Sequence, residues 1–167
     1  MNRAILPALL LASCAAYRGP GHHFDPARLD REDGWLTAGD VPLIRQQGDS
    51  DCGAAALAMV LGYWQRPLGG AELAEARKLG PRGGAPAGHL RDLRYELRRG
   101  RPVMVGMLKR HGDRLLAHYE VVVAIHPTRG VVVTLDPARG WQEYDVAGFL
   151  QEWKPTQQLA LVVTGRR

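Results

Sequence analysis

Residues 52–64 (CGAAALAMVLGYW) form a run of almost entirely apolar and small side chains. The run is too long for one ordinary strand and matches the length of a helix. A surface helix keeps a polar side toward water, so a helix that is apolar nearly all round must be central and buried. Asp49, Ser50 and Asp51 stand directly before the run, and these residue types cap helix N-termini. The chain is therefore expected to build its core around this helix.

The hydrophobic pattern changes from helical to strand-like after Gly100. On the amino-terminal side, amphipathic patterns predict further helices over residues 70–79 and 88–99, with a Gly/Pro-rich loop at 80–88 between them. On the other side, β-branched runs predict strands over residues 102–108, 119–125, 131–135 and 159–163. Helices followed by antiparallel strands indicate an α+β fold.

Shorter segments complete this expected arrangement. Residues 126–130 are expected to be a five-residue hairpin loop, and Lys109–Arg114 a polar loop. Asp145 is placed to cap a short helix that ends at Trp153. The apolar stretch 41–44 predicts an edge strand.

The amino terminus has the pattern of a bacterial lipoprotein signal. Arg3 precedes a short apolar run, which is too short for a permanent membrane span of about 20 residues. The run ends in Leu11-Ala12-Ser13-Cys14, which resembles a lipobox, where the signal is cut before a lipidated cysteine. We expect Cys14 to carry acyl chains that anchor the protein to the cell envelope. Ala15 after the cysteine favours delivery to the periplasmic face of the outer membrane.

Length and composition limit the remaining possibilities. A chain of 167 residues suits one compact domain. We divide it into a signal peptide (1–13), a tether and lead-in that lies on the surface (14–40), and a folded domain (41–167). The formal net charge is +5, but the basic residues are scattered arginines with few aromatics among them, which predicts no nucleic-acid partner. Two cysteines form no disulfide scaffold, and lipidation of Cys14 leaves Cys52 as the one remaining thiol.

Cys52 stands at the predicted N-terminus of the central helix. The free N–H groups and the dipole at this end of a helix stabilise an anion, so they favour the thiolate. A cysteine nucleophile also needs a nearby base and a group that orients the base. His111, His118 and His126 are the candidates in the sheet region.

Hairpin geometry favours His118 among these histidines. If the five-residue loop is centred on Thr128, Asp136 lies opposite Glu120, and His118 is a diagonal neighbour of Asp136 on the same face. Diagonal Cα atoms lie about 7–8 Å apart, within reach of a side-chain hydrogen bond. A slip of one residue would turn one partner to the other face. An oxyanion donor is also required, and either Gln46 or Gln47 is near enough in sequence to supply it.

Three segments resemble the bacteriocin-processing, double-glycine-leader cysteine peptidases. Residues 46–60 resemble the nucleophile motif, in which Gln, five residues and Cys-Gly precede Ala and Leu-x-Met along a helix. Residues 118–123 (HYEVVV) resemble the histidine strand, and residues 135–140 (LDPARG) resemble the Asp-Pro segment. The resemblance covers roughly residues 41–164.

The resemblance implies a papain-like fold and peptide-bond hydrolysis through an acyl-enzyme, often after Gly-Gly. Cys52 would be the nucleophile, His118 the base and later the acid, Asp136 the orienting group and Gln46 the oxyanion donor. The implied partners are a peptide or protein substrate and a separate export system. No metal or other cofactor is expected. ATP binding is not transferred, because the chain lacks a phosphate-binding Gly-x-x-x-x-Gly-Lys loop.

One departure from the family keeps other functions open. Residues 87–93 and 94–103 resemble two pieces that the family separates by a helix-to-strand connection, so the middle of this chain is compressed. A shortened substrate groove would suit a non-catalytic binding or assembly lipoprotein with a papain-like fold. A third reading is a murein amidase, another thiol enzyme with Cys on a helix before a His-bearing sheet.

Overall fold

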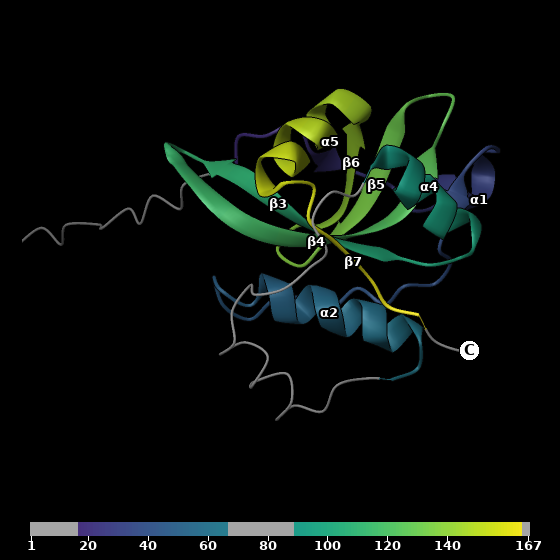
Figure 1. The fold of residues 1–167 in the computed structure, drawn as a ribbon, viewed down its shortest axis with the longest axis horizontal. Helices are drawn as coiled ribbons and strands as arrows, with labels where there is room; N and C mark the ends of the chain where they lie inside the picture. Colours follow the sequence, from purple (N-terminus) through teal and green to yellow (C-terminus); the bar gives the residue numbers. More distant parts are fainter. Residues whose placement is uncertain (1–16, 67–88, 165–167) are drawn as a thin grey trace, which may run out of the picture.

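One antiparallel sheet organises the chain (Figure 1). The computed structural model describes residues 17–66 and 89–164, and within them the strand order is β1-β6-β5-β4-β3-β7, with β2 paired to β4 outside this path. The strands are β1 (His22–His23), β2 (Leu36–Thr37), β3 (Val103–His111), β4 (Arg114–His126), β5 (Val131–Asp136), β6 (Gly140–Asp145) and β7 (Ala160–Val162).

Helices cover both faces of this sheet (Figure 1). Helix α2 (Cys52–Tyr63) lies along one face, and α5 (Val146–Trp153) lies on the other. The remaining helical elements are α1 (Arg28–Arg31), α4 (Leu90–Arg98) and the 3-10 turn η1 (Lys154–Thr156). This arrangement confirms the predicted α+β class.

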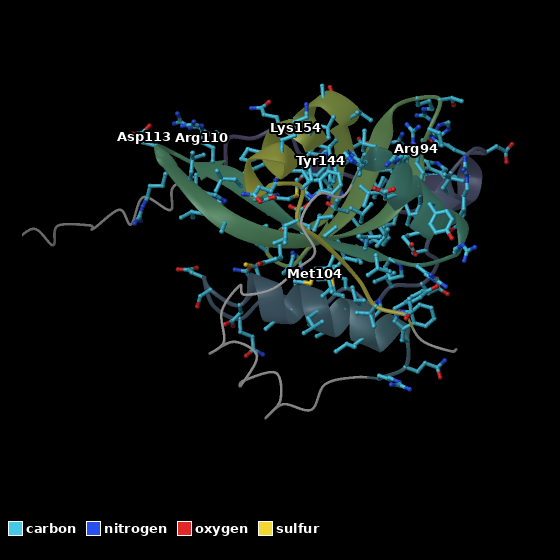
Figure 2. All side chains as sticks on the ribbon, in the orientation of Figure 1. Arg94, Met104, Arg110, Asp113, Tyr144 and Lys154 are labelled. Carbon is cyan, nitrogen blue, oxygen red and sulfur yellow. The ribbon has the colours of Figure 1, made fainter. Side chains whose placement is uncertain are left out.

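Helix α2 is the buried central helix that its apolar run predicts. Its buried residues include Ala54, Ala55, Ala56, Met59 and Val60, which lie on different sides of the helix. Met59 and Val60 have no exposed surface. Full burial of one such side chain contributes about 1.5–3 kcal/mol, so the helix is held by its packing. Figure 2 shows Met104 of β3 on the side of the sheet that faces α2.

The β3–β4 hairpin is longer than the strand pattern predicts. Its pairing continues to His111↔Arg114, so the turn between the strands consists only of Gly112 and Asp113. Figure 2 shows Arg110 and Asp113 at this end of the hairpin. The prediction of a polar loop over Lys109–Arg114 is therefore wrong. Lys109 is 1% exposed inside the sheet, because its ammonium group has buried carboxylate partners that are distant in sequence.

The β4–β5 hairpin has a shorter loop than predicted and a compensating bulge. His126 pairs with Val131, which leaves a four-residue loop instead of five. A bulge between Val122 and Ala124 then shifts the register by one residue, and Val121 pairs with Leu135. Beyond the bulge, the register is the one expected from a loop centred on Thr128.

The expected lead-in is integrated into the fold. Strand β1 pairs with β6, β2 pairs with the end of β4, and Phe24 between them is completely buried. The predicted edge strand over residues 41–44 is absent, and Leu36–Thr37 takes the place beside β4. Pro42 in the predicted strand has no N–H to donate to a ladder, which disfavours that pairing.

The carboxyl-terminal helix and strand agree with prediction. Asp145 accepts a hydrogen bond from Gly148 N at 2.6 Å and so caps α5, which ends at Trp153 as expected. Strand β7 lies within the predicted strand 159–163, whereas β6 was not predicted.

The middle of the chain also agrees with the sequence prediction over the residues that the structure describes. Helix α4 is one continuous helix that leads directly to β3, so residues 89–103 hold no additional strand. The helix predicted over 70–79 lies outside the described residues. No helix in the described ranges has the length and apolarity to cross a membrane.

Candidate active site

Several charged residues share the face of the sheet that is turned away from α2. Side chains alternate between the two faces along a strand, and directly paired residues share a face. Lys109 pairs with Leu116, so it projects to the same face as His118 and Glu120, which follow on β4. Asp136 ends β5 and lies beside the same positions. The sheet therefore gathers two carboxylates, one ammonium group and one imidazole.

Cys52 approaches this group from α2, where it is the first helical residue. The His118 side chain and the backbone N–H groups of Tyr119 and Gly53 lie near its sulfur and lower its pKa as hydrogen-bond donors. Gly53 lets the helix approach β4 closely, because a Cβ there would lie 3.3 Å from Cδ2 of Tyr119. Cys52 is 7% exposed, so the residue lies at the edge of the core.

The structure brings His118 and Asp136 together, as the predicted register requires. Nε2 of His118 lies 2.8 Å from Oδ1 of Asp136, which leaves Nδ1 as the ring nitrogen for Cys52. The bulge around Val123 makes this contact possible. Without the bulge, the four-residue loop would place His118 and Asp136 on opposite faces.

The Asp136 carboxylate is held by hydrogen bonds on both oxygens. Oδ1 accepts from the backbone N–H groups of Ala138 at 2.8 Å and Arg139 at 3.3 Å. Oδ2 accepts from Nζ of Lys109 at 3.1 Å. The carboxylate is completely buried, so these contacts fix the direction in which it faces His118.

These contacts favour a thiolate–imidazolium pair. Burial alone would raise the pKa of Cys52, but hydrogen bonding and the charge of His118 outweigh it and lower that pKa. Burial would likewise lower the pKa of His118, but Asp136 and Cys52 raise it to about 9. Burial opposes ionisation of Asp136 too, yet His118 and Lys109 lower its pKa well below the usual range. At pH values between the pKa of Cys52 and that of His118, the three groups therefore carry alternating charges.

Gln46 lies beside the Asp136 turn, and its side-chain amide donates to its own turn. Its backbone N–H donates to Pro137 O at 3.1 Å, and its Nε2 donates to Gly48 O at 2.9 Å. The amide oxygen of Gln46 is buried without a hydrogen-bond partner. Gln47 is exposed. The backbone of Gln46 is therefore tied near the site, whereas its amide is used within its own turn.

Lys109 and its partners are the part of the site that sequence reasoning missed. Nζ of Lys109 contacts Glu120, and it donates to Tyr144 OH at 2.8 Å. Glu120 also accepts from Thr134 Oγ1 at 2.5 Å and from Tyr144 OH at 3.1 Å. Figure 2 shows Tyr144 between the sheet and α5. A signal was present, because a glutamate directly opposite Asp136 in the expected register requires a neighbouring cation.

Tyr17 closes this buried group from the amino-terminal side. Its ring centroid lies 4.7 Å from Nζ of Lys109 and 3.9 Å from the guanidinium carbon of Arg139. Its hydroxyl donates to Glu152 Oε1 at 2.7 Å. Burial is the main cause that raises the pKa of Tyr17 to about 12. Residues before the predicted domain boundary therefore contribute to the surroundings of the site.

The same face contains the one group of possible metal ligands among the described residues. One ligand atom each from His118, Glu120 and Asp136 lie within 4.8 Å of one another. However, the ammonium group of Lys109 contacts both carboxylates. A protein cation already neutralises these residues, so the arrangement does not fit a dedicated metal site.

The other two candidate histidines, His111 and His126, have different surroundings. The ring of His111 lies 5.6 Å from that of Tyr17 at the end of β3. Nε2 of His126 donates to the carbonyl of Asp33 at 3.0 Å, and its ring packs edge-on against Trp35. Neither contact involves Cys52, so His118 is the histidine that the fold brings to the thiol.

Sequence comparison identifies the family that this geometry resembles. Residues 40–96 match the model of the Peptidase C39 family, and the match includes Cys52 and all of α2. The segment that carries Cys52 is therefore similar to the C39 peptidase family. No curated protein matches the sequence. His118 and Asp136 lie beyond the matched segment, so their relation to Cys52 rests on the contacts described above.

Proposed function

We propose that this protein is an envelope-anchored cysteine peptidase that hydrolyses a peptide bond through a thioester. One observation carries the proposal: the imidazole of His118 contacts both the Cys52 thiol at the start of α2 and the buried Asp136 carboxylate. A nucleophile, a base and a group that orients the base are the parts that such chemistry needs.

The reaction begins with attack of the Cys52 thiolate on the substrate carbonyl carbon. The oxyanion that forms accepts hydrogen bonds at the helix N-terminus, and Gln46 supplies an amide donor after its side chain leaves Gly48. His118 then gives its proton to the leaving nitrogen, and the C–N bond breaks. Water next attacks the thioester while His118 takes its proton. Cleavage of the C–S bond restores the thiolate.

Replacement of Cys52 tests this mechanism directly. Cys52→Ala is expected to abolish hydrolysis of fluorogenic peptides and labelling at this position by a thiol-reactive probe. His118→Ala is expected to slow both reactions. Cleavage by Cys52→Ala at the wild-type rate would show that the mechanism is wrong.

The substrate is proposed to carry small residues before the cleaved bond. A peptide with Gly-Gly before that bond and an otherwise identical peptide with Leu-Leu form a matched pair. We expect faster cleavage of the Gly-Gly peptide. Equal or faster cleavage of the Leu-Leu peptide would contradict the proposed double-glycine specificity but not the proposed peptidase activity.

The anchoring proposal is supported by the lipobox-like residues that end at Cys14. Metabolic labelling with a radioactive fatty acid should mark the wild-type protein but not Cys14→Ser. Fractionation of the bacterial envelope should place the wild type in the outer membrane. Absence of label on the wild type would contradict the anchoring and not the catalytic proposal.

The burial of Cys52 supports a second candidate, a non-catalytic binding or assembly lipoprotein. Cys52 is a buried residue, 7% exposed, so only small reagents meet it unless the site opens. This candidate predicts a Cys52 that resists iodoacetamide in the folded protein. Rapid alkylation that is lost in His118→Ala would favour the peptidase.

A further inference from the structure

Two buried carboxylates, Asp136 and Glu120, share one ammonium group behind His118. One carboxylate oxygen of each residue lies within 4.8 Å of the other, and both side chains are completely buried. Two anions at this distance in a low-dielectric interior repel strongly, so one of them takes up a proton unless a cation is present. Lys109 is that cation, because its Nζ contacts Glu120 and lies 3.1 Å from Asp136 Oδ2.

We infer that Lys109 is a positioning residue for the peptidase site: it keeps Asp136 ionised beside Glu120 and turns the carboxylate toward His118. Lys109 does not touch the thiol, and it acts through Asp136. The inference rests on the proposed function, since it assigns a role within the same site.

The two carboxylate oxygens of Asp136 have different hydrogen-bond partners. Oδ2 accepts a hydrogen bond from Lys109. Oδ1 accepts hydrogen bonds from His118 and from the backbone N–H groups of the following turn. The charges then alternate from the Cys52 thiolate through His118, Asp136 and Lys109 to Glu120. Loss of Lys109 would leave Asp136 and Glu120 as adjacent like charges. Protonation of Asp136 would then remove the anion that supports the imidazolium.

The charged and titratable groups around Lys109 come from every element packed on it. They are His118 and Glu120 of β4, Asp136 of β5, Tyr144 of β6, Glu152 of α5, and Tyr17 of the amino-terminal segment, with Arg139 on the far side of the Tyr17 ring. Burial alone would lower the pKa of Lys109, but the charges of Glu120 and Asp136 raise it, so the ammonium stays protonated.

The test measures how the reactivity of Cys52 depends on pH, which needs no known substrate. Full-length protein is alkylated with iodoacetamide between pH 4 and 10, and the Cys52 peptide is quantified by mass spectrometry. Lys109→Met removes the charge and keeps much of the side-chain volume. We expect the acidic limb of the profile to move up by at least one pH unit, which is about a tenfold slower reaction on that limb.

Two further variants separate this role from a structural one. In Lys109→Met/Glu120→Gln the second carboxylate is neutral, so Asp136 stays ionised and the acidic limb should return to within about threefold of the wild-type rate. Lys154→Met is the matched control, because Lys154 is an exposed lysine on η1. It should leave the profile unchanged.

The outcomes decide the inference whether or not the single variant folds. A folded Lys109→Met with the wild-type acidic limb would overturn it, and so would a double variant whose acidic limb stays displaced. If thermal unfolding shows that Lys109→Met is unfolded, the double variant alone gives the decision. Alkylation of wild-type Cys52 that is indifferent to His118→Ala would instead overturn the proposed function.

Discussion

Nε2 of His118 and Oδ1 of Asp136 lie 2.8 Å apart, and the same oxygen accepts two backbone N–H groups from the turn that follows β5. Because that turn continues directly from a central strand, the carboxylate has no freedom to swing away. The orientation of the His118 imidazole is therefore fixed, with Nδ1 toward α2.

Asp136→Asn should lower kcat by about 10²–10⁴-fold, the range expected when a positioned acid–base group fails. The amide preserves the size of the side chain but removes the charge that supports the imidazolium. Peptide hydrolysis by purified protein checks the value, with thermal unfolding as the control for folding. An Asn variant with wild-type kcat would show that the carboxylate has no role in the reaction.

The rates of hydrolysis and of Cys52 alkylation should depend differently on pH at high pH. The pKa of Cys52 lies below its ordinary value and that of His118 is about 9, so the ion pair exists between these two values. Hydrolysis should fall as pH rises through about 9, because a neutral imidazole cannot protonate the leaving nitrogen. Alkylation of Cys52 should not fall there, since the thiolate persists. Both rates should fall on the acidic side as the thiolate takes up its proton.

Gln46→Ala should reduce kcat by about 10²–10³-fold, the usual cost of one oxyanion donor. Alkylation of Cys52 should stay at the wild-type rate, because iodoacetamide forms no oxyanion. Gln47→Ala is the matched control, since Gln47 is the adjacent, exposed residue of the same type. Equal losses in the two variants would argue against a specific role for Gln46.

Asp145→Ala should reduce the free energy of unfolding by about 1 kcal/mol through loss of the α5 cap. Its carboxylate accepts from Gly148 N at 2.6 Å. Asp145→Asn keeps an acceptor and should recover most of the stability. Urea denaturation measures both changes, while the Cys52 alkylation rate should stay constant. No loss of stability in the alanine variant would show that the cap is energetically unimportant.

Local sequence patterns determined the elements that carry the thiol, the imidazole and the carboxylate. The apolar run from Cys52 has a single solution, a buried helix, because no face of it suits water. The β-branched runs around His118 and Asp136 specify neighbouring strands of a hairpin. The α+β order of elements follows from the same local signals.

Tertiary structure alone decided the register and the buried charges. The bulge between Val122 and Ala124 corrects for a loop one residue shorter than expected, and no local pattern encodes that correction. Lys109 resembles a loop residue in sequence, yet it is buried because Glu120, Asp136 and Tyr144 converge on it from three strands. Burial of a charge depends on partners that are distant along the chain, and only the folded sheet brings those partners together.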